Sequence, residues 1–314
     1  VYWPLGFLSL VLRNFEGVYD YYASIIGSLR ARGIRFSVKS QFMHNCIPKT
    51  DGVHTLSWHT YGASPGLRHL KESPLPGFFY FDPTGYSGWA KIAKESSRTI
   101  EQALSTINPL EAERYFQGLV DRFITTGKSK YEQNVNPDLK LPDRYVFIPL
   151  QLLDDHVAEL THWDSMRLVE HVIRLLWRTG ISLVVKRHPK CRHRRVDAFL
   201  EELKQQPDVH IVNAPIHHLI RGSMAVCTIN SGVGAEALLM LKRVFTASPT
   251  DYDYLSKDIR TVKSKADFIA SIQEEIDVKK YVGFMCFYCR DYLVDAFDSK
   301  IVQRRVNEWL QKTE

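Results

Sequence analysis

Residues 145–250 alternate between short apolar runs and segments with helical spacing, and this alternation restricts the fold more than any other feature of the chain. Met166, Val169 and Ile173, for example, recur every three or four positions, as on one face of a helix. The apolar runs, each interpreted as a strand, are Tyr145–Leu150, Ile181–Val185, His210–Val212, Met224–Ile229 and Val244–Ala247. The helical segments between them are Asp164–Thr179, Val196–Gln205, Ile216–Arg221 and Gly234–Leu241. Such alternation predicts an α/β fold with a parallel sheet that helices cover on both faces.

Polar side chains follow the first four runs, at the point where each predicted strand ends. They are Gln151, Asp154, Asp155, Lys186, His188, Pro189, Asn213, His217, Asn230 and Ser231. Ligands bind beyond the carboxyl ends of the strands in such sheets, so we expect these residues to face one crevice. Turn-forming residues would explain some of them, but a His-Pro pair and a Gln-x-x-Asp-Asp pattern are not typical of turns.

The remaining chain is less regular, and its 314 residues suit two domains. We expect residues 1–140 to form an N-terminal domain, residues 141–275 a C-terminal domain, and residues 276–314 helices that pack back across both. The expected elements outside the alternating part are a helix at Val18–Arg32, a strand at Ile34–Val38, an ordered but irregular, site-forming stretch at Asn45–Gly88, a helix at Ser97–Phe123, a linker at Thr126–Asp143 and a mainly helical C-terminus.

The opening stretch VYWPLGFLSLVL is apolar, but it is shorter than the ~20 residues of a membrane-spanning helix. No basic segment precedes it, as a signal peptide would require, so we expect a strand or turn of the core. Since the first residue is Val1 and not methionine, we expect a piece of a longer protein. Five scattered cysteines favour a reducing compartment, and hence the cytoplasm. Cys286 and Cys289 lie in an apolar stretch, which predicts two buried thiols rather than a zinc site with its four ligands.

Positive charge is modest overall, at +6, but it is dense in the run from Lys186 to Arg195. Such a run suits phosphate groups, an anionic membrane surface or nucleic acid, and a solvated basic face is the simpler alternative. The run lacks the interleaved aromatic residues on which bases stack, so no nucleic-acid partner is expected.

The loop NSGVGAEALL follows the fourth predicted strand and opens a helix. Its Gly232-x-Gly234-x-x-Ala237 pattern fits the dinucleotide fingerprint, and Asp251 or Asp253 could supply the acidic residue ~20 positions further on. That fingerprint belongs after the first strand of a domain, however, where this chain has PLQLLDDH and no glycine. Binding of a phosphate or nucleotide at the helix N-terminus is therefore favoured, with a plain helix cap as the alternative.

Three further groups have the residue types that glycosyl chemistry requires. His188 could donate to a phosphate or protonate a leaving group, or be a surface histidine. Asp154-Asp155 and Glu72 could form the pair of carboxylates that such chemistry commonly uses across a cleft. Asp154 and Asp155 could equally cap the next helix.

Together these stretches resemble the bacterial capsule polysaccharide biosynthesis proteins, which include the β-Kdo transferases (Kdo is 3-deoxy-D-manno-oct-2-ulosonic acid). The resemblance lies in FIPLQLLDDHV, VVKRHPK, APIHHLI, TINSGVGAEALLMLKRVFT, KESPLPGFFYFDPTGYSGWAKIA and GKSKYEQ, and it spans about residues 55–255. It implies a GT-B architecture, in which two Rossmann-like domains face each other across a cleft. It also implies the donor CMP-Kdo, bound mainly by the C-terminal domain without a metal or other cofactor.

The resemblance also implies roles for individual residues. His188, Asn230 and Ser231 would lie at the CMP phosphate; Lys186, Lys130 and Ser129 would meet the phosphate or the Kdo carboxylate; and Glu236 would reach the ribose. Gln151, His217 and Gly232 complete the expected donor site.

The β-Kdo transferases resemble retaining enzymes that act by double displacement, which implies Asp155 as nucleophile, Asp154 as its alternative and Glu72 as acid/base. The partners would be the sugar nucleotide and an oligosaccharide or lipid-linked acceptor of capsule, O-antigen or lipopolysaccharide synthesis, with peripheral binding to the inner membrane as an option. Arg187 stands where relatives have proline, and Cys191–Arg195 is unusually basic. A transferase for another nucleotide sugar and a non-catalytic module that binds anionic glycolipids therefore stay open, and the sequence specifies neither acceptor, linkage nor oligomeric state.

Overall fold

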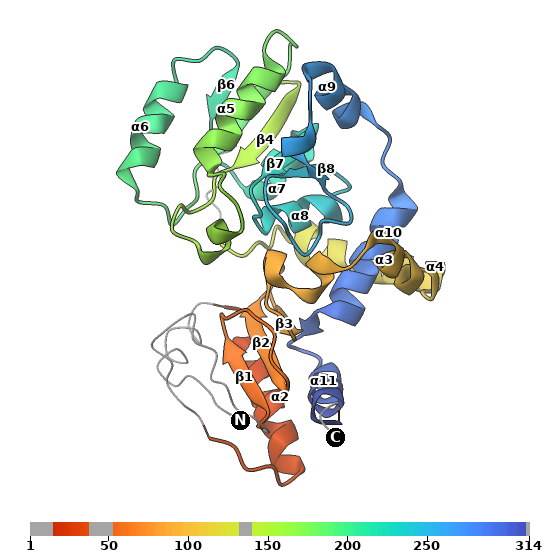
Figure 1. Cartoon of the computed structure of the whole chain (residues 1–314). Helices are drawn as coiled ribbons and strands as arrows, with labels where there is room; N and C mark the ends of the chain where they lie inside the picture. Colours follow the sequence, from red (N-terminus) through yellow and green to blue (C-terminus); the bar gives the residue numbers. More distant parts are fainter. Residues whose placement is uncertain (1–14, 38–52, 132–139, 312–314) are drawn as a thin grey trace. The chain divides into compact units, whose positions relative to one another are not determined.

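The computed structural model describes residues 15–37, 53–131 and 140–311, which form two compact units (Figure 1). Unit 1 combines Val1–Thr106 with Cys286–Glu314, and unit 2 comprises Ile107–Met285. The contacts thus group residues 107–140 with unit 2, while the expected domain division at residues 140 and 275 stays a prediction. The opening stretch at residues 1–12 and residues 132–139 of the expected linker lie outside the described residues.

Unit 2 contains a six-stranded parallel sheet in the order β6-β5-β4-β7-β8-β9. Its strands are β4 (Tyr145–Pro149), β5 (Ser182–Lys186), β6 (Val209–Ile211), β7 (Ala225–Thr228), β8 (Arg243–Thr246) and β9 (Lys257–Asp258). Its α-helices are α4 (Pro109–Leu119), α5 (Ser165–Leu176), α6 (Arg194–Leu203), α7 (Ile216–Gly222), α8 (Val233–Leu239), α9 (Lys265–Gln273) and most of α10 (Val278–Cys286). The predicted α/β fold and Rossmann-like sheet are confirmed, and each predicted element between residues 145 and 247 is present.

Helices cover both faces of this sheet because its strands are apolar on both sides. Val146 and Ile148 of β4 share one core with residues of α5, α6 and α9. Tyr145 points to the opposite face, as neighbouring strand residues must, and its hydroxyl donates to the carbonyl of Leu219 in α7. The chain runs outward from β4 to β6 and then returns to β7, so the strand order reverses between β4 and β7. That reversal is where ligands bind in open sheets of this type.

Unit 1 contains a mixed four-stranded sheet in the order β1-β2-β3-β10. Its strands are β1 (Thr55–Trp58), β2 (Leu67–Glu72), β3 (Phe78–Asp82) and β10 (Val294–Asp295), and its α-helices are α2 (Val18–Ala31), α3 (Ser97–Ser105) and α11 (Ser299–Gln311). β1 runs parallel to β2, and the other two pairs are antiparallel. Residues of α2, α11 and the sheet form one core, which includes Tyr21, Phe79 and Trp309.

The N-terminal part corrects two sequence predictions. The stretch predicted to be irregular contains β1, β2 and β3, whose short runs show no polar–apolar alternation because residues on both sides are mostly buried. Residues 34–37 of the strand predicted at Ile34–Val38 are not in a strand, and Val38 lies outside the described residues. The predicted helices at Val18–Arg32 and Ser97–Phe123 are confirmed, the latter as α3, α4 and the π-helix η3 (Val120–Thr125).

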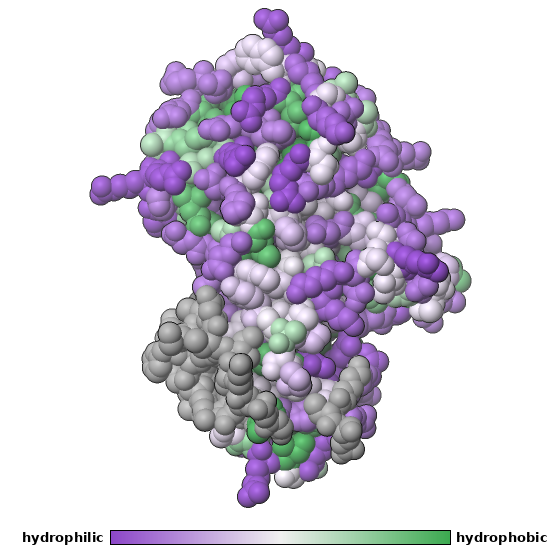
Figure 2. Space-filling model, in the orientation of Figure 1, coloured by the Kyte–Doolittle hydropathy of each residue, from purple (hydrophilic) through white to green (hydrophobic). Residues whose placement is uncertain are grey.

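The structure also tests the sequence predictions about the cysteines, the C-terminal region and membrane-spanning helices. Cys286 and Cys289 are buried, as predicted. The mainly helical C-terminus is confirmed by α10, the π-helix η6 (Phe287–Tyr292) and α11. Within the described ranges, no helix has both the length and the apolar character needed to cross a membrane. Hydrophilic residues predominate on the face shown in Figure 2, with smaller apolar patches between them.

Candidate functional site

Two buried amide side chains are hydrogen-bonded to each other where the strand order of unit 2 reverses, between the ends of β4 and β7. The Gln151 amide nitrogen donates to Asn230 Oδ1 at 2.7 Å, and Asn230 Nδ2 donates to the carbonyl of Val157 and to Ser248 Oγ. Gln151 follows β4 and Asn230 follows β7, so the pair ties the two central strand ends together. Both side chains were expected to bind the donor, but in this structure their amide groups bind other parts of the protein.

Close packing against Tyr252 explains why the loop after β7 has a glycine at position 234. A Cβ atom on Gly234 would lie 2.3 Å from the hydroxyl oxygen of Tyr252, and that hydroxyl donates to the carbonyl of Ser231 at 2.5 Å. Gly232 has φ −56°, which any residue adopts. Asp253, one candidate for the acidic residue of the fingerprint, accepts bonds from Thr250 N and Ser256 Oγ within its own loop. The glycine spacing therefore needs no dinucleotide to explain it.

Glu236 binds two of the other expected site residues. Its Oε2 lies 2.6 Å from His217 Nε2, and its Oε1 accepts a hydrogen bond from Ser129 Oγ at 3.1 Å. The side chains of His217 and Glu236 are only 7% and 4% exposed. Lys186 is also buried and donates to the carbonyl of Ala214. Burial lowers the pKa of the Lys186 ammonium, and the charge of Glu236 partly offsets that effect.

His188 lies in a strongly cationic environment. Burial lowers its pKa to about 4, helped by Lys190, Lys130 and Lys186 and opposed by the negative charge of Asp155. Its ring is therefore neutral near pH 7, and its Nδ1 accepts the backbone N–H of Lys190 at 3.1 Å. The single ring proton must then reside on Nε2, which is a donor suited to a phosphate oxygen.

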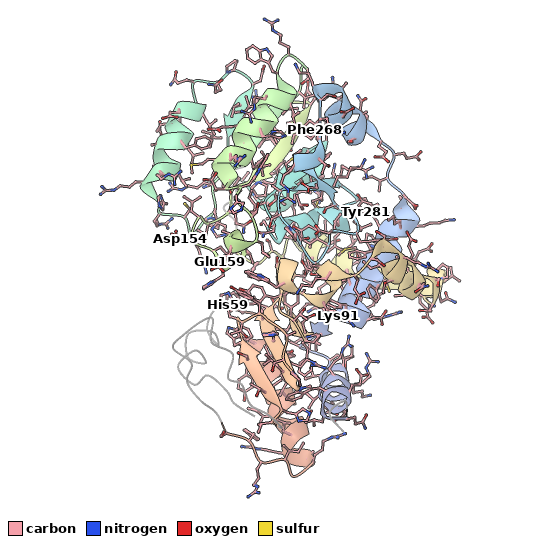
Figure 3. All side chains as sticks on the ribbon, in the orientation of Figure 1. His59, Lys91, Asp154, Glu159, Phe268 and Tyr281 are labelled. Atoms are coloured by element: carbon pink, nitrogen blue, oxygen red, sulfur yellow. The ribbon has the colours of Figure 1, made fainter. Side chains whose placement is uncertain are left out.

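The two aspartates after β4 differ in their surroundings. Asp155 is half-buried and is the residue whose negative charge acts on His188, whereas Asp154 is exposed (Figure 3). Asp155 precedes the 3-10 helix η4 (His156–Leu160), and its side chain makes no capping hydrogen bond there. The cap of α5 is Asp164, whose Oδ1 accepts the N–H of Arg167 at 2.8 Å. Neither Asp154 nor Asp155 therefore caps α5.

Glu72 belongs to unit 1, at the end of β2. It is buried and paired with the ammonium of Lys71, its neighbour in sequence. The Lys71 ammonium also lies 5.8 Å from the centre of the Tyr86 ring. An adjacent ammonium stabilises a carboxylate in its charged form.

Two residues beside His188 were not predicted as site residues. The Tyr131 ring stands edge-on to His188, with 5.1 Å between ring centres, and Lys190 Nζ lies 4.9 Å from the centre of the Tyr131 ring. The sequence contained a clue to each residue. Lys190 belongs to the basic run, and Tyr131 directly follows Ser129 and Lys130 in GKSKYEQ.

The chemistry available at this edge of the sheet is that of an anion site with a carboxylate beside it. Lysine charge, a neutral imidazole donor and Asp155 are brought together from β5, the loop after it and the β4–α5 connection. Within the described part of the chain, no group of three or more His, Cys, Asp or Glu side chains is arranged to hold a metal ion.

The sheet and its strand order define a Rossmann-like α/β protein, in which lysines, His188 and Asp155 lie together at the carboxyl edge of the sheet. Residues 97–255 match the family described as capsule polysaccharide biosynthesis protein, and the chain belongs to that family. Among curated proteins, no sequence matches the chain.

Two solved structures from Thermosulfurimonas dismutans are similar in fold. Its KpsC beta Kdo 2,4 transferase superposes with a TM-score of 0.53 at 16% identity, covering 95% of each chain. Its KpsC beta Kdo 2,7 transferase gives a TM-score of 0.51 at 16% identity, covering 92% of this chain and 96% of the other. At this identity, the similarity demonstrates a shared fold.

Proposed function

We propose that the chain is a glycosyltransferase that moves Kdo from CMP-Kdo to a glycan or glycolipid acceptor, with retention of configuration. The carrying observation is the cluster of His188, Asp155 and three lysines at the carboxyl edge of the sheet. Membership of the capsule polysaccharide family and a fold shared with two Kdo transferases support the same proposal.

In the proposed first step, an Asp155 carboxylate oxygen attacks the anomeric carbon of Kdo, and the bond from that carbon to the CMP phosphate oxygen breaks. The departing phosphate gains negative charge, which Lys130, Lys186 and Lys190 stabilise and to which His188 Nε2 donates a hydrogen bond. Because these side chains supply the positive charge, we expect no metal or other cofactor to be needed. Ser231, Gly232, Ser129 and Glu236 remain proposed donor contacts.

In the proposed second step, an acceptor hydroxyl attacks the same carbon, and the bond to Asp155 breaks. The hydroxyl proton passes to Glu72, which acts as the base and whose neighbour Lys71 favours the charged carboxylate. Two inversions at one carbon give net retention.

Mass spectrometry of the protein with CMP-Kdo and an oligosaccharide or lipid-linked acceptor tests the proposal. We expect a mass gain of one Kdo on the acceptor, unaffected by EDTA. Asp155→Asn should abolish transfer, Asp154→Asn should retain it, and Glu72→Gln should let a Kdo adduct accumulate on the protein. Transfer with another sugar nucleotide but not with CMP-Kdo would refute the donor assignment.

Two departures from the family pattern lie at position 187 and in the basic run that follows it. Arg187, which stands in place of proline, pairs with Asp197 of α6 at 2.6 Å. Arg192, Arg194 and Arg195 are exposed and so are suited to an anionic membrane surface. We therefore propose peripheral binding to the inner membrane from the cytoplasm, which salt-dependent co-sedimentation with anionic vesicles would test.

A further inference from the structure

The segment Lys128–Tyr131 crosses the carboxyl edge of the sheet in unit 2. At its start, Lys128 N donates to the carbonyl of Phe123 at 2.8 Å, which fixes the segment to the end of η3. Ser129 Oγ then bonds to Glu236 of α8, and Tyr131 contacts His188 in the loop after β5. Four residues therefore connect two separate parts of the proposed donor site.

We infer that Tyr131 is a positioning residue of this anion site, which holds the His188 ring and the Lys190 side chain in the arrangement that receives a nucleotide phosphate. This inference rests on the proposed function. Its geometric basis is a three-layer contact: the Lys190 ammonium lies 4.9 Å from the centre of the Tyr131 ring, and the His188 ring stands at 78° to that ring at 5.1 Å.

Two contacts together determine the direction of the His188 donor. The backbone N–H of Lys190 binds Nδ1, and Tyr131 packs against the ring. Without the aromatic ring, the hydrogen bond alone would leave the imidazole free to tilt, so Nε2 would lose its fixed direction. A donor held in place before the ligand arrives contributes more to binding than one that must be ordered on arrival.

Tyr131 also acts on the charge of the site. His188 faces Asp155, Lys130, Lys186, Lys190 and the Tyr131 ring, and burial is the main cause of its lowered pKa. Removal of the ring would admit water to the imidazole, and its pKa would rise towards the ordinary value of about 6.5. Lys190 would lose the cation–π attraction that restricts its side chain.

The test uses the full chain and three proteins: wild type, Tyr131→Ala and Tyr131→Phe. NMR titration of the His188 ring reports its protonation midpoint, and calorimetry with pyrophosphate and with CMP reports anion binding. For Tyr131→Ala we expect the midpoint to rise and the affinity for both anions to fall roughly two- to fivefold, as loss of a cation–π contact implies. Tyr131→Phe keeps the ring and should restore both values.

A matched control is present in the same unit, where Lys280 Nζ lies 4.4 Å from the centre of the Tyr254 ring. Tyr254→Ala removes an equivalent contact and should change neither the His188 midpoint nor anion binding. The inference is overturned if Tyr131→Ala behaves as wild type in both measurements, or if Tyr131→Phe is as impaired as Tyr131→Ala. If the midpoint and pyrophosphate binding respond to Tyr131 while CMP-Kdo gives no transfer, the inference stands and the proposed function fails.

Discussion

At the scale of single residues, the polar side chains at the carboxyl edge of the sheet differ in what they bind. The Gln151 amide nitrogen donates to the side-chain oxygen of Asn230, and Glu236 is held by His217 and Ser129. His188 differs, because its Nδ1 is occupied and its Nε2 carries the proton. A polar residue at a strand end is thus not by itself evidence of a contact to a ligand.

Gly234→Ala tests whether the glycine in the loop after β7 serves packing. Alanine normally stabilises a helix relative to glycine by about 1 kcal/mol. Here its Cβ would lie 2.3 Å from the Tyr252 hydroxyl oxygen, so we expect a net loss of about 1–3 kcal/mol in the free energy of unfolding. Urea denaturation measures the change.

Gly118→Ala in α4 is the matched control, because outside its own helix backbone and chain neighbours no atom lies within 4 Å of the added Cβ. It should raise the free energy of unfolding by about 0.4–1 kcal/mol. Equal stabilisation by both substitutions would show that Tyr252 does not constrain position 234.

His188 should also shape the dependence of stability on pH. Its pKa is about 4 in the folded chain, against about 6.5 when unfolded. Between these values the unfolded chain binds a proton that the folded chain does not, so the free energy of unfolding falls as the pH drops through this window. His188→Gln should reduce that loss, measured by urea denaturation between about pH 7 and about pH 5.

The pH dependence of stability must be compared between variants, because Asp253 changes the stability of every variant in the opposite direction to His188. Burial raises its pKa to about 6, so the folded state gains stability there as the pH falls. His210→Gln, at an exposed position in β6, is the matched histidine substitution with which His188→Gln is compared. A profile for His188→Gln that coincides with that of wild type would contradict the prediction.

At the scale of elements, α5 shows how one cap determines where a helix begins. Asp164 accepts the N–H of Arg167, and its ion pair with Arg195, at 3.9 Å, is exposed and contributes little. We expect Asp164→Ala to lower the free energy of unfolding by about 0.5–2 kcal/mol, measured in urea. Asp154→Ala, which removes an exposed aspartate from the same connection, should change it by less than about 0.5 kcal/mol. The reverse order would mean that Asp154 is the cap.

The alternating strands and α-helices between residues 145 and 247 of unit 2 were predictable because each carries its own signal. β5 lies in an apolar run with β-branched residues at Ile181, Val184 and Val185, and α5 repeats apolar residues at helical spacing. In unit 1, β1, β2 and β3 are four to six residues long and mostly buried on both sides, so polar–apolar alternation did not distinguish them from loops. Their pairing depends on residues distant in sequence, including β10.

At the scale of the whole molecule, both chain ends contribute to unit 1. Trp309 of α11 is 2% exposed, packs in the core with α2 and donates its indole N–H to the carbonyl of Gly66. Trp309→Ala should therefore cost about 3–5 kcal/mol of unfolding free energy, as other large aromatic truncations do. Circular dichroism during urea denaturation measures the loss.

Trp177→Ala serves as the control, since Trp177 is 53% exposed at the end of α5. It should alter the free energy of unfolding by less than about 0.5 kcal/mol. Similar losses for both variants would contradict the assignment of Trp309 to a core that both chain ends form.

The sequence by itself determined the α/β class and the parallel sheet of unit 2, because local periodicity and strand–helix alternation are short-range properties. It also marked Asp155 and His188 as candidates. Only the tertiary structure decided that Gln151 binds Asn230, that Gly234 makes room for Tyr252, and that Tyr131 lies against His188. These are contacts between residues 18 to 79 positions apart, as with Gln151 and Asn230 or Gly234 and Tyr252, and no local pattern specifies which side chains will meet when distant segments pack together.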